Sequence, residues 1–522
     1  MGVGTKLAAP IALLAALAGA QPATAQEQRD CFWQGGTRST NIAYPDLGAR
    51  YWVSSFPLPP GAELVLRGRY PHARYMSFNV YDAAAQPTDG LADVDVAPDA
   101  GSSNPFAAGA QRDVAGRGYT VRVVSGARPD RREPNTIYLN AGGQPSAVGV
   151  IIYRVYVADS GRDVSGGVGL PEVSMRLPSG RELDQPATCE SRADTGANQA
   201  VEAFHANADG PGADPRDPTV EDPIRWEAFF NYFQAFSYPA QATPAAAVRE
   251  AVVPRERLGG FLSNVDNAYT IASANRGVGP VLVVEGRAPV TPRTLDGRRV
   301  MEGGQVRYWS LCENEVASQR VIDCVYDEQV RTDPSGRFRL VMSTPGDRPA
   351  NATPECGTSW IAWGVQPDGL LILRHMLPSV SFAQAIQRVS EPGTERAVVG
   401  EYLPVGRHTT KAEFESRGCA PSASGAGAAP ARPARPRIRL SVVPARARFG
   451  RAVRFRFLAT YRAAGRVHRL AGARVRFANE VGTTNARGRV TIVQRFTHAR
   501  GYRPRGCHAG FACGRAAVRV VR

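Results

Sequence analysis

Short runs in which apolar and polar residues alternate recur along most of the chain. Residues 63–67 and 75–81 alternate in this way, whereas residues 148–157 are more continuously apolar. A period of two places successive side chains on opposite faces of a strand, and an unbroken apolar run is typical of a central strand. Glycine and proline separate the runs, which favours turns between antiparallel strands. Residues 26–190 are therefore predicted to form a β-sandwich.

A second set of strand-like runs extends from about residue 281 to residue 402. It is preceded by residues 224–233, where apolar side chains recur at helical spacing directly after Asp222-Pro223, a common signal for the start of a helix. Residues 222–420 are therefore predicted to form a short helix followed by a second β-sandwich.

The two modules resemble each other in sequence. Three short stretches match in the same order, which indicates an internal duplication more strongly than any one match would. The matched pairs are residues 68–71 with 286–289, residues 121–125 with 339–343, and residues 151–154 with 371–374. The first pair is followed in both modules by an Arg-Tyr-x-Ser sequence, which begins at Arg74 and at Arg307. The duplication predicts that Arg154 and Arg374 occupy equivalent positions on two related strands.

Arginine alternates strictly with apolar residues in the C-terminal part of the chain. The alternation is clear at residues 437–440, 454–457 and 474–477, so that one face of each strand would be apolar and the other a row of guanidinium groups. Residues 437–522 are predicted to form one sandwich. Their pattern and length resemble those of the immunoglobulin-like stalk domains common in exported actinobacterial proteins.

Two stretches between these modules are predicted to be linkers. Residues 191–221 are rich in Ala, Asp, Gly and Pro, and residues 421–436 combine Ala, Ser and Gly with Ala-Pro-Ala-Arg repeats. The predicted fold class is mainly β, with two related antiparallel sandwiches, a short helix before the second, and a C-terminal immunoglobulin-like sandwich.

Charge is distributed very unevenly along the chain. The 522 residues include 63 Lys and Arg against 47 Asp and Glu, a formal net charge of +16. Residues 432–522 contain 23 Arg, no Lys and one acid, Glu480, which gives +22 and leaves −6 for residues 1–431. A surface this basic attracts polyanions, so an anionic cell-wall polymer is a candidate partner, with nucleic acid only incidental. The alternative is a solvated stalk whose arginine content reflects a GC-rich genome.

The N-terminus has the features of a secretory signal. Lys6 is followed by an apolar run over residues 7–20 and then by Ala23-Thr24-Ala25. The apolar run is shorter than the roughly 20 residues of a membrane-spanning helix. Residues 1–25 are therefore predicted to be a signal peptide, and the mature protein to be secreted or envelope-associated, without a membrane span.

The cysteines are predicted to form disulfides rather than metal sites. Their number is even, at 8, which suits an exported chain, although 8 cysteines allow about 105 pairings. Spacing favours the pairs Cys31–Cys189, Cys312–Cys324, Cys356–Cys419 and Cys507–Cys513. The alternative for the last pair, a metal site that also uses His508, lacks a fourth ligand. No metal and no cofactor are predicted.

The first module has a strand-like run at residues 75–82, an arginine-bearing run at 153–156 and a Gly- and Pro-rich segment at 166–171. In this pattern it resembles a bacterial domain-of-unknown-function family, numbered twelve-fourteen. In the second module the resemblance is interrupted at residues 311–314, and a Val-Tyr-Asp sequence follows only at 325–327, which leaves open whether Asp327 is the counterpart of Asp82. The resemblance implies a β-sandwich and brings no established activity.

Chemistry is harder to assign than fold. The sequence contains no nucleophile elbow, metalloprotease helix motif, phosphate-binding glycine loop or redox Cys-x-x-Cys, so no catalytic residue is assigned. Arginines within apolar strands must be paired if they are buried, and tryptophans on a sandwich suit sugar stacking. The candidate cleft residues are Asp82, Arg154, Trp360, Trp363, Arg374 and His375. The alternative for the two arginines is a role in structural ion pairs.

Two functions are open at this point. The first is an exported, envelope-associated binding or structural protein with a basic C-terminal tether. The second is an extracellular enzyme acting on a carbohydrate or another small polar substrate, with Asp82, His72 or His375 in acid–base roles. A deep pocket that gathers several titratable groups would favour the enzyme, and a shallow surface would favour binding.

Overall fold

The computed structural model describes most of the chain. The described residues are 32–35, 41–82, 86–140, 148–184, 221–230, 262–315, 318–419, 437–450, 452–463, 466–478, 480–496, 501–508, 511 and 513–521. The chain divides into two compact units, Met1–Ser424 and Gly425–Arg522. The predicted signal peptide, the Cys31–Cys189 pair, the 421–436 linker and nearly all of the 191–221 linker lie outside the described residues.

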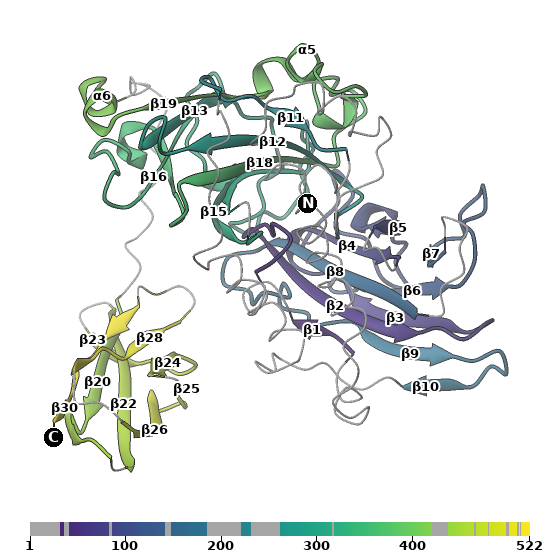
Figure 1. Cartoon of the computed structure of the whole chain (residues 1–522). Coiled ribbons are helices and arrows are strands. Elements are labelled where there is room, and N and C mark those ends of the chain that lie inside the picture. The colour runs from purple at the N-terminus through teal and green to yellow at the C-terminus, as the bar shows by residue number, and fades with distance from the viewer. Residues whose placement is uncertain are drawn as a thin grey trace, which may run out of the picture. The chain divides into compact units, whose positions relative to one another are not determined.

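The first sandwich, module 1, consists of two five-stranded sheets (Figure 1). The first sheet has the order β1 (Gln34–Gly35), β2 (Ala49–Pro57), β8 (Val148–Ala158), β4 (Ala73–Tyr81), β5 (Pro87–Ala92). The second has the order β10 (Glu182–Asp184), β9 (Glu172–Arg176), β3 (Glu63–Arg69), β6 (Gly118–Val124), β7 (Thr136–Tyr138). Apolar side chains from both sheets, including Phe78, Val121 and Tyr153, fill the space between them.

The second sandwich, module 2, repeats this arrangement. Its first sheet has the order β11 (Glu227–Ala228), β12 (Asn267–Asn275), β18 (Asp368–Met376), β14 (Tyr308–Asn314), β15 (Val321–Tyr326). Its second has the order β17 (Thr358–Ala362), β16 (Arg337–Ser343), β13 (Val281–Arg287), β19 (Val405–Thr409). Two short helices lie near the end of the module in sequence: α5 (Glu395–Val399) between β18 and β19, and α6 (Lys411–Ser416) after β19.

Strand order and register confirm that the two sandwiches are related. Strands β2 to β9 correspond one by one to β12 to β19, and in both modules one strand pair, β6–β7 and β16–β17, is parallel. Arg154 lies opposite Tyr51 and Ser77 on its neighbouring strands. Arg374 lies opposite Tyr269 and Ser310. The two arginines therefore occupy the equivalent positions that the duplication predicts.

The register also identifies the counterparts that the sequence left open. Ser77 pairs with Ala92 in module 1, and Ser310 pairs with Tyr326 in module 2. Asp327, which follows Tyr326, is therefore the counterpart of Asp93 rather than of Asp82. Both aspartates begin a short 3₁₀ helix, η2 (Asp93–Asp95) and η4 (Asp327–Gln329).

The helix predicted over residues 224–233 is not formed in its described part, residues 224–230. Ile224, Trp226, Ala228 and Phe230 are buried while the residues between them are more exposed, a period of two. Glu227 and Ala228 form β11, which pairs with β12. The apolar side chains of this segment fit both periods, and pairing with an open sheet edge selects the extended form. Residues 231–233 lie outside the described residues.

The two modules pack through the outer faces of their first sheets. Tyr75, Tyr156, Tyr308 and Met376 form one apolar cluster that draws on both modules. The hydroxyl of Tyr308 donates to Asp46 of module 1 (2.9 Å). In the same way, the hydroxyl of Tyr75 donates to Asn264 of module 2 (3.1 Å), which is the counterpart of Asp46. Such exchanged contacts are the signature of a two-fold arrangement, here within one chain.

Ion pairs between the modules repeat this exchange. Arg74 of module 1 binds Asp327 (2.7 Å) and Glu328 of module 2. Arg307, the counterpart of Arg74, binds Asp93 of module 1 (3.2 Å). The repeated Arg-Tyr-x-Ser sequence therefore marks the interface between the modules.

Three of the four predicted disulfides are present: Cys312–Cys324, Cys356–Cys419 and Cys507–Cys513. No described cysteine is free. Within the described residues, no helix is both long and apolar enough to cross a membrane.

The C-terminal unit is built of short strands around its own apolar core, to which Phe455, Phe477 and Phe496 contribute. One sheet has the order β20 (Arg439–Val443), β22 (Ala452–Ala463), β23 (Arg466–Arg469), with β26 (Arg489–Arg495) also paired to β22. The others are β21 (Arg446–Arg448), β30 (Val518–Val521), β27 (Gly501–Tyr502) and β25 (Glu480–Thr483), β24 (Arg474–Phe477), β28 (Arg505–Cys507), β29 (Gly514–Arg515).

Candidate functional site

The six residues of the predicted cleft lie in separate places. Asp82 is exposed in the turn after β4, where its carboxylate accepts a hydrogen bond from the backbone N–H of Gln86 (2.9 Å). Arg374 and His375 are neighbours on β18 and face opposite sides of the sheet, as successive residues of a strand do. Arg374 faces module 1, and His375 faces the interior of its own sandwich, near the Phe382 ring. The alternation of the strand therefore prevents a shared cleft.

The two tryptophans are also apart. Trp360 lies on the outer face of the second sheet of module 2, where the guanidinium of Arg348 is 4.4 Å from the ring centre. Trp363 is buried inside the sandwich. Neither residue stacks beside Arg374, so the predicted set does not form one binding surface.

Arg154 and Arg374 connect the two modules. Arg154 donates to the backbone carbonyl of Leu262 (2.6 Å), which leads into the first long strand of module 2. Arg374 donates to the carbonyl of Tyr44 (2.6 Å), which leads into β2 of module 1. Each arginine thus fixes the entry segment of the other module. This role agrees with the structural alternative for the two arginines.

The charges of these arginines are balanced in different ways. The guanidinium of Arg374 is 3.9 Å from the carboxylate of Asp46. Among the described residues, no carboxylate lies within 4.0 Å of Arg154, whose guanidinium instead faces the rings of Tyr51 (5.5 Å) and Tyr81 (5.7 Å). A cation over an aromatic face is stabilised without a counter-ion.

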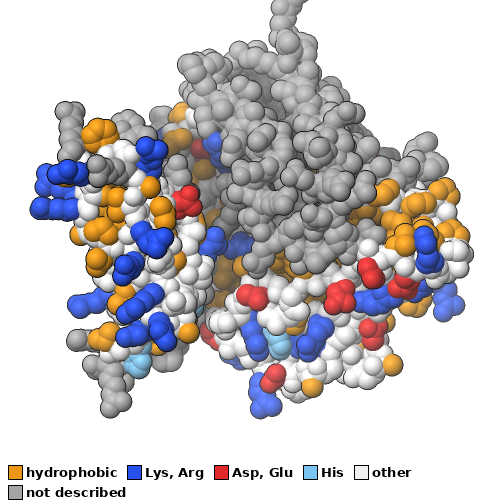
Figure 2. All heavy atoms as spheres, turned by 90° about the horizontal axis from the view of Figure 1, so that it is seen from below, with side chains coloured by type: hydrophobic (Ala, Val, Ile, Leu, Met, Phe, Trp, Pro, Cys, Tyr) orange, Lys and Arg blue, Asp and Glu red, His pale blue; other side chains and the backbone are white. Residues whose placement is uncertain are grey.

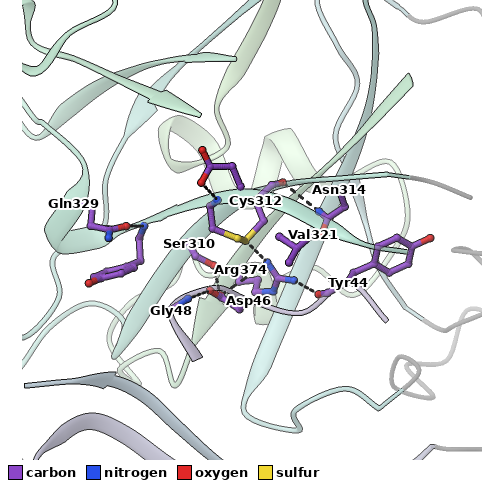
Figure 3. Close-up of a disulfide and its surroundings, with 12 residues drawn as sticks. Tyr44, Asp46, Gly48, Ser310, Cys312, Asn314, Val321, Gln329 and Arg374 are labelled. Atoms are coloured by element: carbon purple, nitrogen blue, oxygen red, sulfur yellow. Dashed lines mark hydrogen bonds and ion pairs between the residues drawn. A yellow bond between two sulfur atoms is a disulfide. The ribbon is translucent and has the colours of Figure 1, made fainter. Parts of the chain in front are cut away.

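Figure 3 shows the surroundings of Arg374, where Asp46 and the Cys312–Cys324 disulfide meet. Potential metal-ligand atoms of Asp46, Cys312 and Cys324 lie within 4.8 Å of one another. The two sulfurs are bonded to each other, however, and the guanidinium of Arg374 is 3.0 Å from Cys312 Sγ. A disulfide offers no thiolate, and the nearby cation disfavours a metal ion.

The two histidines suggested for acid–base chemistry are neutral at neutral pH. Burial lowers the pKa of His375 to about 3, and its Nδ1 accepts a hydrogen bond from the backbone N–H of Ile386 (3.4 Å). Burial, together with the charges of Arg117 and Arg162, lowers the pKa of His72 to about 4. Neither imidazole titrates near neutral pH, as a general base would.

The C-terminal unit carries the strongest local charge in the molecule. Three exposed arginines stand directly opposite one another on adjacent strands: Arg476 on β24, Arg505 on β28 and Arg515 on β29. Figure 2 shows Lys and Arg side chains, in blue, spread over the face of this unit that the view presents, at the left. Adjacent strands lie about 4.8 Å apart, so the three side chains form a compact row.

The row formed by Arg476, Arg505 and Arg515 has an electrostatic cost when no anion is bound to it. Like charges directly opposite each other on neighbouring strands repel. Arg446 and Arg519 form another such pair on β21 and β30. Glu480 is the one acid in residues 432–522 of the sequence, so the unit brings almost no negative charge of its own. An anionic ligand would relieve the repulsion.

Only part of this arrangement is visible in the sequence. Arg476 lies within an alternating run, whereas Arg505 and Arg515 lie outside such runs and come next to Arg476 only through strand pairing. The Arg-Tyr-x-Ser repeat at Arg74 and Arg307 was visible, whereas its role between modules depends on the fold.

Comparisons with known proteins give distant structural likenesses. No family model matches the chain, and no curated protein matches it. An uncharacterised protein from Burkholderia cenocepacia is similar at 13% identity and a TM-score of 0.41, over 79% of this chain and 98% of that one. The VPA0106 protein of Vibrio parahaemolyticus is similar at 9% identity and a TM-score of 0.35, over 76% and 96% of the two chains. The D0-D1 domain of intimin gives 7% identity and a TM-score of 0.14, over 49% and 91%.

Proposed function

We propose that the protein is an exported, envelope-associated binding protein whose C-terminal unit attaches it to an anionic polymer. The observation that supports this most is the row formed by Arg476, Arg505 and Arg515, exposed and in register across three strands. Guanidinium groups bind phosphate and carboxylate oxygens through paired N–H donors. A linear polyanion laid across the strands could contact all three.

The proposed ligand is an anionic cell-wall polymer. The N-terminal sequence predicts export, and an exported protein seldom meets nucleic acid. Membership in the domain-of-unknown-function family numbered twelve-fourteen remains a prediction, as do export itself and cleavage after Ala25.

Retention of the full chain on anionic cell-wall material across a salt series tests the proposal. Binding that releases counter-ions weakens steeply as salt rises. The triple variant Arg476→Gln, Arg505→Gln, Arg515→Gln should be eluted at lower salt than the wild type, with a shallower dependence on salt.

A matched control removes the same charge elsewhere on the unit. Arg439, Arg487 and Arg503 are exposed and are not paired with one another in the sheets, so replacing these three with Gln changes the net charge equally. The control should retain more binding than the row variant. If both triple variants lose the same amount of binding, the charge acts as a diffuse basic surface and not as a row. If the retention of the wild type does not change with salt, the proposal is without support.

A further inference from the structure

The C-terminal unit has a second basic surface, on the side of its sandwich opposite the arginine row. It belongs to the sheet in which β20, β23 and β26 pair with β22 (Figure 1). The inner side of this sheet packs on the sheet that carries the row, since the ring centres of Phe455 and Phe477 are 4.9 Å apart. Phe477 faces this core from β24, so the neighbouring Arg476 faces the other way. The two basic surfaces therefore point in opposite directions.

Strand register shows which side chains lie on the outer side of the β22 sheet. On β22, Phe455 and Phe457 are buried in the core, so Arg454, Arg456 and Leu458 face outward. The residues paired with these outward positions on the neighbouring strands face outward as well. We call this surface the β22 face. Six exposed arginines lie on it: Arg439, Arg454, Arg456, Arg469, Arg489 and Arg495.

Exposed valines stand between these arginines. Val443 on β20 is directly opposite Arg456, and Val493 on β26 is directly opposite Arg454. Val467 lies on the same face, on β23. Val443, Val467 and Val493 are 68%, 60% and 53% exposed. One exposed valine is ordinary on a protein surface, but here three share a face with six cations. The β22 face thus mixes cationic and apolar groups, whereas the arginine row sets arginine opposite arginine.

The charge of the β22 face is not neutralised by acids of the same face. None of the residues that the register places on this face is acidic. Glu480, the one acid of residues 432–522, lies on β25 in the other sheet. Guanidinium groups keep their charge at every physiological pH. The face therefore attracts anions, with a strength that falls as salt screens the charges.

The valines indicate which kind of anion suits this face. A hydrophilic polyanion offers charges but no apolar surface that would cover a valine. A bilayer that contains anionic lipids offers both, because its headgroups carry the charge and the boundary with its acyl chains accepts apolar side chains. Arginine also suits this boundary, because its aliphatic stem lies along apolar groups while the guanidinium reaches polar ones.

We propose that the β22 face binds the surface of an anionic phospholipid bilayer. The arginines contact the phosphates of the headgroups, and Val443, Val467 and Val493 enter the boundary with the acyl chains. Val443 and Val493 lie on either side of β22, roughly 10 Å apart, so both sides of the face are anchored. This surface is separate from the arginine row, to which the polymer is proposed to bind. Each proposal therefore stands or fails without the other.

Co-sedimentation of the full chain with lipid vesicles tests the proposal. The vesicles consist either of phosphatidylcholine alone or of equal parts of phosphatidylcholine and phosphatidylglycerol. The wild type should sediment with the mixed vesicles and stay in solution with the neutral ones, and its binding should weaken as salt rises. Failure to bind the mixed vesicles, or equal binding to both kinds, would overturn the proposal.

Replacing the three valines separates lipid binding from charge attraction alone. The triple variant Val443→Thr, Val467→Thr, Val493→Thr keeps β-branched side chains and every charge, so the sheet should persist. Loss of the apolar contact should weaken binding to the mixed vesicles about tenfold. If this variant binds as the wild type does, charge alone accounts for the attraction and the proposal is wrong.

The matched control changes three exposed valines of module 2: Val290→Thr, Val365→Thr and Val380→Thr. It makes the same chemical change outside the β22 face and should bind the mixed vesicles as the wild type does. Thermal unfolding verifies that both triple variants are folded. An equal loss of vesicle binding in the two variants would show that the valines of the β22 face have no special role.

The variant of the arginine row distinguishes this proposal from polymer binding. Arg476, Arg505 and Arg515 face away from a bilayer bound to the β22 face, and salt screens charges at that distance. Their replacement by Gln should therefore weaken vesicle binding less than the valine variant does. The valine variant should keep the wild-type retention on anionic cell-wall material. If the row variant loses as much vesicle binding as the valine variant, the attraction belongs to the whole unit and the proposal is wrong.

Discussion

The two sandwiches of the first unit share a strand order but differ in what their interiors contain. Module 1 has Val80 and Val155 where module 2 has Glu313 and His375. Both polar side chains are fully buried. An interior carboxyl or imidazole costs stability, so these two positions make the interior of module 2 less favourable than that of module 1. The comparison shows that the shared strand order accepts either apolar or polar side chains at these interior positions.

A cross-strand position shows how far the copies can diverge without changing register. Asn79 faces Gly90 in module 1, and the Cys312–Cys324 disulfide takes the same pair of positions in module 2. A methyl group on Gly90 would lie 2.1 Å from Asn79 Nδ2, so the asparagine depends on that glycine. What both copies keep is the set of arginines at the interface between them.

Loss of Arg74 should have the largest effect on stability. Its side chain is fully buried against Asp327 and Glu328, so Arg74→Ala leaves two buried carboxylates without their counter-charge. We expect the free energy of unfolding to fall by about 3–5 kcal/mol, measured by guanidinium denaturation. Arg307→Ala, which removes one partly exposed pair with Asp93, should cost less.

The exposed pair Arg298–Glu302 is the control for charge removal alone. Arg298→Ala should change stability by no more than about 0.5 kcal/mol. If Arg74→Ala is no more destabilising than this control, the exchanged ion pairs do not hold the modules together.

The sandwich class and the duplication could be predicted because both depend on local pattern. Period-two runs define strands wherever they occur, and the matched stretches that contain Arg154 and Arg374 lie in the same register. The helix predicted over residues 224–233 is wrong in its described part, residues 224–230, because the apolar residues there fit a helix as well as a strand, and only the open edge of β12 decides between them.

The candidate sites were less predictable, because they depend on which strands become neighbours. Arg374 and His375 are adjacent in sequence yet face different environments. The sequence match between the copies breaks at residues 311–314, the segment that holds Glu313, so its exchange for Val80 becomes visible only through strand register.

His375 should make module 2 sensitive to acid in a way that Val155 does not make module 1. Its pKa is about 3 in the folded chain, against about 6.5 when unfolded, so the unfolded state binds a proton first as the pH falls. Stability from this group is present above pH 6.5 and is lost toward pH 3. Relative to His375→Val, the wild type should lose about 2 kcal/mol between pH 6.5 and pH 5. A difference that stays constant over this pH range, in denaturation at each pH, would contradict the neutral state of His375.

The smallest expected effect compares two equivalent glycines, Gly149 of β8 and Gly369 of β18. Gly149→Ala forces a methyl group to within 2.7 Å of the Phe56 ring and should destabilise the chain by about 1–3 kcal/mol. Gly369→Ala meets its nearest atoms, Glu313 Oε1 and Trp363 Nε1, at 3.2 Å, so these side chains need to shift less than the Phe56 ring and the cost should be smaller, about 1 kcal/mol. Thermal unfolding of both variants beside the wild type gives the two values. Equal losses would mean that the end of module 2 is as tightly packed around its glycine as that of module 1.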